Sequence, residues 1–171
     1  MLIQIQNTRQ EDIPVIFTLY DEAISYQQQV GNNYWLGFEV ALIEKEINEN
    51  RHFKVLLDGR IGGTFVITLD DKLIWKFAQD APAVYIHRIA TARASRGNDL
   101  VKHIIEWAIS YAVQHSLSFI RMDTGSGNDR LINYYSRCGF TVVDSNTTVD
   151  YTPDLPAHYQ NGVFTLLEMA V

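Results

Sequence analysis

The stretch Tyr85-Ile-His-Arg-Ile-Ala-Thr91, followed by the turn Arg96-Gly-Asn-Asp99, decides the fold of this chain. The first segment is rich in β-branched and aromatic residues, which predicts a central strand of a sheet. The turn leads into a segment over 98–115 whose apolar residues share one broad helical face. A short strand over 118–123 and a short helix over 128–138 come next, so the middle of the chain predicts a strand-helix-strand unit.

The flanking segments add further strands and helices. Thr8 is expected to cap a helix, with Glu11 as its capping-box partner. The dipeptide Asp58-Gly59 separates two strand-like segments and is a strong hairpin signal. Residues 75–78 are expected to continue the antiparallel pairing. The other predicted strands are 3–5, 52–57, 61–69, 141–143 and 163–169, and the other predicted helices are 13–24 and 40–47. This order predicts an α+β or mixed α/β fold.

Composition places the chain among ordinary globular proteins. Its 171 residues suit one domain, 1–171, and 47% of them are hydrophobic while 20% are charged. The net charge of -6 argues against nucleic acid as a partner. A single cysteine, Cys138, excludes an internal disulfide and fits a reducing compartment. No apolar run approaches the roughly 20 residues that span a bilayer, so we expect a cytoplasmic protein without membrane contact.

The central unit resembles a known family. The 85–91 strand, the turn that follows, Asn128 and the stretch Tyr134-Tyr-Ser-Arg-Cys-Gly-Phe140 are similar in order and spacing to the acyl-CoA-binding core of the GNAT N-acetyltransferases. The resemblance covers about half of the chain, 84–140. It implies a GNAT-like fold with a mostly antiparallel central sheet flanked by helices. It also implies transfer of acetyl from acetyl-CoA to a primary amine of a small molecule or peptide, by direct attack in a ternary complex.

The resemblance assigns residues to the cofactor. A turn at a helix start offers unpaired N–H groups and a partial positive charge, which together hold phosphate. Pantetheine is expected to pair with the end of the 85–91 strand, and the pyrophosphate to lie on the turn. The residues implied are Ile89, Ala90, Thr91, Arg96, Gly97, Asn98, Asp99, Leu100, Val101, Asn128 and Tyr135.

The turn departs from the family pattern, because the usual glycine positions hold Asp99 and Val101. A carboxylate at Asp99 would stabilise the helix start but repel a pyrophosphate. Arg93, Arg96 and Lys102 could offset that repulsion. In the alternative reading Asp99 only caps the helix and no phosphate binds. The altered glycines favour a second function, that of a non-catalytic acyl-CoA-binding or sensing module.

The resemblance also implies catalytic residues. Tyr135 matches the family's general acid, and a reference pKa of about 10 keeps its hydroxyl a proton donor at neutral pH. As an alternative, Tyr135 is a core aromatic residue. The general base is open between Asp123, His87 and a water chain. Asp123 could instead tie down the glycine-containing loop that follows it. Strand alternation places His87 on the face of Tyr85 and Ile89, which favours a satisfied core histidine.

An aromatic loop is the candidate wall of the acceptor site. Tyr34, Trp35 and Phe38 are expected to contact the acceptor together with His87, although such a loop could equally be anchored to the core. The other histidines, at 52, 103, 115 and 158, show no ligand spacing, so we expect no metal. The late strands could pair across a homodimer. The identity of the acceptor amine has no signature in the sequence.

Overall fold

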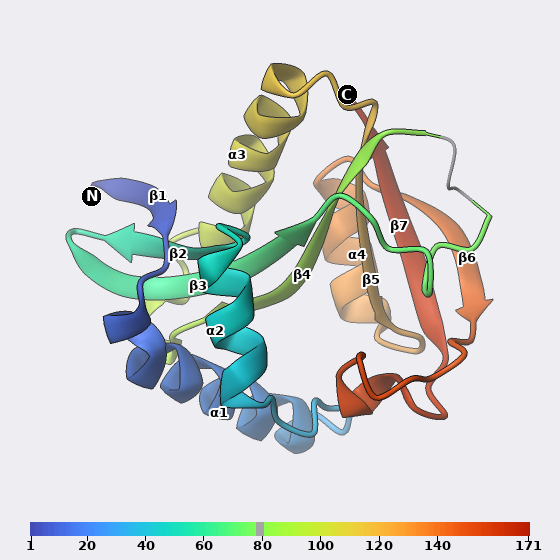
Figure 1. The fold of residues 1–171 in the computed structure, drawn as a ribbon, viewed down its shortest axis with the longest axis horizontal. Coiled ribbons are helices and arrows are strands. Elements are labelled where there is room, and N and C mark those ends of the chain that lie inside the picture. The colour runs from blue at the N-terminus through green and yellow to red at the C-terminus, as the bar shows by residue number, and fades with distance from the viewer. Residues whose placement is uncertain (78–80) are drawn as a thin grey trace.

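The computed structural model describes residues 1–77 and 81–171. Seven strands form one sheet in the order β1-β2-β3-β4-β5-β7-β6 (Figure 1). Neighbouring strands are antiparallel except β4 and β5, which are parallel. The predicted α+β fold with a mostly antiparallel sheet is confirmed. The strands are β1 (Ile3–Asn7), β2 (His52–Leu57), β3 (Arg60–Thr68), β4 (Ala83–Thr91), β5 (Phe119–Gly125), β6 (Thr141–Thr147) and β7 (Phe164–Ala170).

Helices and loops cover both faces of this sheet. The helices are α1 (Ile13–Gln29), α2 (Val40–Asn48), α3 (Leu100–Gln114) and α4 (Asp129–Arg137), with 3-10 turns η1 (Gln10–Asp12), η2 (Arg93–Ser95) and η3 (Ala157–Tyr159). The largest core cluster joins α3 and α4 to the sheet. A second cluster joins α1 and α2 to the sheet, and a third lies beneath η3 and the loop after β3. None of the helices in the described residues is long and apolar enough to cross a bilayer.

A β-bulge in β4 reverses its alternation. Val66 pairs with His87 while Thr64 pairs with Ala90, so Phe65 opposes two residues of β4. Arg88, inside the bulge, has a φ of 50°. Extra residues of this kind bend a strand and shift its side chains to the other face.

Because of the bulge, His87 does not share one face of the sheet with both Tyr85 and Ile89, as strand alternation predicts. Before it, Tyr85 packs with the cluster beneath η3, whereas after it Ile89 packs against the α3 and α4 core. These two residues therefore lie on opposite faces, and the expectation that His87 shares a face with both is wrong. The parallel ladder with β5 also ends at the pair Ile86–Met122, so β4 and β5 separate beyond that point.

The start of α1 differs from the prediction. The Thr8 hydroxyl contacts Nδ1 of His52 at 2.8 Å instead of capping a helix. The Arg9 N–H donates to the Asp12 carboxylate at 2.8 Å, and α1 begins only after this turn. The other ring nitrogen of His52 lies 3.0 Å from the Tyr20 hydroxyl. Burial lowers the pKa of His52 to about 3, so this histidine is a neutral core residue.

The predicted strand over 75–78 is also wrong where it can be compared. Residues 75–77 form no strand, with residues 76 and 77 in a turn, and Ala78 lies outside the described residues. The Trp75 side chain is buried and anchors the loop after β3. This loop positions one residue of the site described below.

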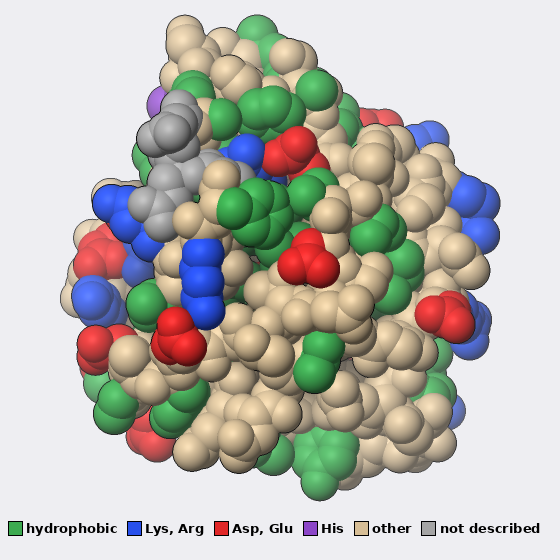
Figure 2. All heavy atoms as spheres, turned by 90° about the vertical axis from the view of Figure 1, so that its right-hand side faces the viewer, with side chains coloured by type: hydrophobic (Ala, Val, Ile, Leu, Met, Phe, Trp, Pro, Cys, Tyr) green, Lys and Arg blue, Asp and Glu red, His purple; other side chains and the backbone are tan. Residues whose placement is uncertain are grey.

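The edge strand β6 lies on the face drawn in Figure 2. In the described part of that face, hydrophobic side chains form small separate groups, and basic and acidic side chains are interspersed. This face therefore lacks the broad basic surface that nucleic-acid-binding proteins present.

Candidate active site

A cavity of about 1310 Å³ lies where β4 and β5 separate. Its walls come from the ends of these two strands, the loop over 30–36, the start of α4 and the segment over 158–164. The predicted site residues that line it are Tyr34, Trp35, His87, Ile89, Ala90, Thr91, Arg96, Val101, Asp123, Asn128 and Tyr135. The fold thus gathers into one cavity residues that span a hundred positions of the sequence.

The turn before α3 presents free backbone donors. The first helical hydrogen bond runs from the His103 N–H to the Asp99 carbonyl, at 3.2 Å. The N–H groups of Leu100, Val101 and Lys102 precede it and have no carbonyl partner within the helix. Donors of this kind, at the positive end of a helix dipole, fit a phosphate.

Asp99 keeps the backbone shape that a glycine would favour. Its φ of 51° and ψ of 32° lie in the left-handed region, which Asp tolerates better than most residues. Its side chain makes no capping hydrogen bond, so the reading of Asp99 as a side-chain cap is wrong. Gly97, Asn98 and Asp99 do not line the cavity, and the side chain of Leu100 is buried in the core.

Two features that hold this turn were not singled out in the sequence. Gly62 of β3 faces it, and a Cβ there would lie only 2.6 Å from the Ser95 hydroxyl. A glycine inside a strand often marks such a close approach. The guanidinium of Arg96 lies 4.4 Å from the centre of the Tyr26 ring, which directs this cation along the wall of the cavity.

Tyr135 is both a core residue and a cavity residue. It is 7% exposed, and its ring lies 6.0 Å from that of Phe140. Burial, with smaller effects of Tyr134 and Cys138, raises the pKa of Tyr135 above its ordinary value. The hydroxyl therefore keeps its proton at any neutral pH. Asn128 positions the helix that carries Tyr135, because its side-chain oxygen accepts the Leu131 N–H at 3.3 Å.

Three ionisable side chains meet at His87, and two of them, His87 and Asp123, line the cavity. Nδ1 of His87 lies 3.5 Å from Oδ1 of Asp123, and Nε2 lies 3.0 Å from Oδ2 of Asp71. The Tyr159 hydroxyl donates to the second oxygen of Asp123 at 2.9 Å. Asp71 was missed in the sequence, because it lies in a loop that carries no recognisable motif. One ring nitrogen of His87 and one carboxylate oxygen from each of Asp71 and Asp123 lie within 4.8 Å of one another, a grouping that histidine spacing did not indicate.

The surroundings shift the pKa values of Asp123 and His87. Burial raises the pKa of Asp123 to about 6, against the opposing effect of His87. Burial alone would lower the pKa of His87, but the nearby Asp71 and Asp123 carboxylates raise it above its ordinary value. A carboxyl group with a pKa of about 6, placed beside an imidazole, is suited to accept a proton during catalysis.

The aromatic loop serves two purposes. Tyr34 and Trp35 line the cavity, and the Trp35 N–H donates to the Gln27 side chain at 2.9 Å. Phe38 does not line it. Its ring lies 4.9 Å from that of Tyr20 and beneath the Arg88 guanidinium, so it anchors the loop to the core.

Comparisons with known proteins agree with this geometry. Residues 16–140 match the model of the acetyltransferase (GNAT) family. The chain belongs to the GNAT family, and it is an acetyl-CoA-dependent N-acetyltransferase. Members of this family acetylate amines.

Individual relatives are distant in sequence. The uncharacterized N-acetyltransferase YesJ of Bacillus subtilis is 21% identical over 146 residues, which is 81% of each chain. A GNAT acetyltransferase structure from Listeria monocytogenes superposes with a TM-score of 0.78 at 23% identity, covering 99% of this chain and 95% of that one. One from Streptococcus agalactiae gives 0.78 at 16% identity with the same coverage. At these identities the structures support the fold alone.

Proposed function

We propose that the protein transfers acetyl from acetyl-CoA to a primary amine of a small molecule or peptide, by direct attack in a ternary complex. One observation carries the proposal. A buried proton donor, Tyr135, and a pair of adjacent proton acceptors, His87 and Asp123, line the same cavity. Acyl transfer to an amine needs both, since the amine must lose a proton and the thiolate must gain one.

The cofactor half of the cavity lies along the separated part of β4. Beyond Ile86 its edge has no β5 partner among the described residues, so the backbone of Ile89, Ala90 and Thr91 can pair with the amides of pantetheine. The N–H groups at the start of α3 and the Arg96 guanidinium would hold the pyrophosphate. Bound there, acetyl-CoA supplies the activated thioester.

Acetylation of an ammonium group removes two protons from its nitrogen and adds one to the sulfur of CoA. The His87 and Asp123 pair accepts one from the attacking ammonium group, which leaves the nitrogen lone pair free. As the new C–N bond forms and the C–S bond breaks, the nitrogen loses its second proton to solvent, and the Tyr135 hydroxyl would donate a proton to the departing sulfur. Solvent would then return a proton to Tyr135, so that one proton is released overall with the amide and free CoA. A water molecule between the pair and the amine is equally compatible with this scheme.

The acceptor would enter past the aromatic loop. Tyr34 and Trp35 offer apolar ring surface, and the Asp123 carboxylate attracts an ammonium group. This combination favours a cationic amine with a flat or apolar body.

A second function is supported by one observation. The exposed carboxylate of Asp99 lies at the start of α3, where it would repel a pyrophosphate. Weak cofactor binding without turnover would make the protein an acyl-CoA-binding module.

A thiol-release assay with acetyl-CoA over a panel of primary amines separates the two functions. We expect thiol release matched by an N-acetylated amine in mass spectrometry, together with thermal stabilisation by acetyl-CoA. Stabilisation without thiol release would favour the binding module. No binding at millimolar acetyl-CoA would contradict both.

A further inference from the structure

Asp71 is fixed in space by the loop after β3. Its backbone carbonyl accepts the N–H groups of Ile74 and Trp75, at 3.1 and 2.8 Å. The Trp75 side chain is 1% exposed, and its ring lies 5.9 Å from that of Tyr85. A buried tryptophan therefore anchors the tight turn that carries Asp71, and the carboxylate has a defined position.

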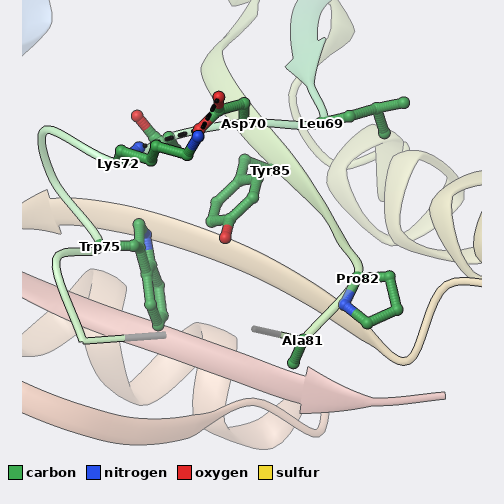
Figure 3. A pocket seen from close by; sticks show the side chains of 8 residues that line it. Leu69, Asp70, Lys72, Trp75, Ala81, Pro82 and Tyr85 are labelled. Carbon is green, nitrogen blue, oxygen red and sulfur yellow. Dashed lines mark hydrogen bonds and ion pairs between the residues drawn. The ribbon is translucent and has the colours of Figure 1, made fainter. Parts of the chain in front are cut away.

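Asp71 approaches His87 from behind the acceptor cavity. His87 and Asp123 line the large cavity, whereas Asp71 lines a second one of about 230 Å³. In Figure 3 the rings of Trp75 and Tyr85 point into this smaller cavity, and Asp70 pairs with Lys72 at its edge. Asp71 borders this smaller cavity, but only 9% of its side chain is exposed.

The two ring nitrogens of His87 thus face different surroundings. Nε2 lies 3.0 Å from Asp71, and Nδ1 faces Asp123 at 3.5 Å, beside the acceptor cavity. A carboxylate at one ring nitrogen holds the proton there, which leaves the other nitrogen free to accept one. Asp71 is thus the closer of the two carboxylates to the ring, although neither Oδ2 of Asp71 nor Oδ1 of Asp123 forms a well-aligned hydrogen bond in the described residues.

We propose that Asp71 is a positioning residue for catalysis: it keeps the proton of neutral His87 on Nε2 and directs Nδ1 at the acceptor amine. This inference rests on the proposed function, and it narrows the general base to His87, with Asp123 binding the ammonium group. Asp71 touches neither substrate and acts through the imidazole alone.

Electrostatics support the same assignment. The groups that face His87 are Asp71 from the loop, Asp123 from β5 and Arg88 beside it in β4. His158 also interacts electrostatically with His87, and Tyr159 interacts with both carboxylates. Burial and Arg88 lower the pKa of His87, and the two carboxylates raise it. Loss of the Asp71 charge should therefore move the titration of His87 to lower pH.

The first test needs no acceptor. NMR of protein with isotope-labelled histidine reports the tautomer and the pKa of each imidazole ring. The signal that disappears in His87→Gln belongs to His87. We expect the Nε2–H form and a pKa above 6.5 in the wild type. In Asp71→Asn the pKa should fall and the tautomer preference weaken, while Asp71→Glu should restore both. Identical His87 titration in the wild type and Asp71→Asn would overturn the proposal.

The second test uses thiol release with the best acceptor among spermidine, tyramine, lysine methyl ester and an alanine-initiated peptide. We expect Asp71→Asn to lose at least about tenfold in kcat, part of the roughly 10²–10⁴ that a positioned base contributes. The acidic limb of its pH profile should move to lower pH. Asp70→Asn, one residue away with its carboxylate on Lys72, should keep the wild-type rate and profile.

Chemical rescue distinguishes positioning from a structural role. Asp71→Ala opens the site to the 230 Å³ cavity, so formate added to the assay should restore part of the lost rate. Formate should not accelerate His87→Gln. Failure of rescue in a variant with wild-type melting temperature and acetyl-CoA affinity would overturn the proposal.

Two further outcomes have distinct meanings. If no amine is acetylated by the wild type, the proposed function fails, while the NMR titration still decides the Asp71 and His87 pairing. Dialysis against a chelator should leave the rate unchanged. Loss of activity on chelation and its return with zinc would instead make the three residues metal ligands and overturn the positioning role.

Discussion

Arg88 of β4 and Glu46 of α2 form a buried ion pair at the bulge that separates β4 from β5. The exposed fractions of the two side chains are only 7% and 4%. The guanidinium also lies 4.9 Å from the centre of the Phe38 ring. One cation therefore connects α2, the aromatic loop and the strand that opens the cavity.

Glu46→Gln should destabilise the protein by about 3 kcal/mol, because it leaves the Arg88 charge buried without its partner. Urea unfolding measures this free energy. Glu49→Gln is the matched control, since Glu49 pairs with Arg51 at the surface and should contribute at most about 1 kcal/mol. Equal effects of the two substitutions would show that the buried pair contributes no more than a surface one.

Tyr135→Phe should lower kcat by at least about tenfold, because it removes the hydroxyl that we propose as the proton donor to the leaving sulfur. The affinity for acetyl-CoA, measured by calorimetry, should stay within about twofold, since the ring remains in the core. Tyr134→Phe changes the neighbouring hydroxyl, which interacts with Cys138, and should keep most of the activity. A parallel loss of turnover and affinity in Tyr135→Phe would mean that the residue is structural.

Asp99→Gly should tighten acetyl-CoA binding severalfold. The change removes a carboxylate from the N-terminal end of α3, where we propose that the pyrophosphate binds, and suits the observed φ of 51°. Asp58→Gly provides the control, since Asp58 also has a left-handed φ, 48°, but lies in the hairpin between β2 and β3. The gain in acetyl-CoA affinity of Asp99→Gly over the wild type should be smaller at high salt, because salt screens the repulsion. Weaker binding by Asp99→Gly would contradict a repulsive role for this carboxylate.

The unfolding free energy should depend on pH through Asp123. Burial raises the folded pKa of this carboxyl from 3.8 to about 6, so between these values the folded state holds a proton that the unfolded state has lost. The contribution of Asp123 to the free energy of unfolding is complete below pH 3.8 and is lost as the pH rises through 6. This loss amounts to at most about 3 kcal/mol. The raised pKa of His87 acts in the same direction.

Asp123→Asn removes this dependence. As the pH rises from 4 to 7, the unfolding free energy of Asp123→Asn should increase relative to that of the wild type. Its activity should be lower than that of the wild type. Urea midpoints at several pH values give the comparison, with the exposed Asp154→Asn as control. A constant difference across this range would show that Asp123 titrates normally in the folded protein.

Much of the fold follows from local patterns. The Asp58-Gly59 dipeptide sits in the turn between β2 and β3, and the apolar face over 98–115 forms α3. These features depend on residues close in sequence, where turn chemistry and helical spacing are decisive. The predicted helix cap at Thr8 is wrong because the Thr8 hydroxyl contacts His52, a residue 44 positions away in the sequence.

The geometry of the candidate site could be predicted from the sequence only in part. Strict alternation could not show that Arg88 adopts a positive φ, and this one residue sets the facing of Ile89. Asp71 lies in a turn whose only cue is Trp75, and its meeting with His87 depends on the packing of two distant segments. Tyr135, by contrast, lies on a helix whose spacing was readable, and the fold brings it to the cavity.

The central claim is that acetyl-CoA lies between the separated parts of β4 and β5, with its thioester beside Tyr135. A crystal structure with bound CoA tests this most directly. The account predicts pantetheine along Ile89 to Thr91, the pyrophosphate at the start of α3, and the sulfur within about 4 Å of the Tyr135 hydroxyl. CoA bound elsewhere, or a Tyr135 hydroxyl turned away from the sulfur, would contradict it.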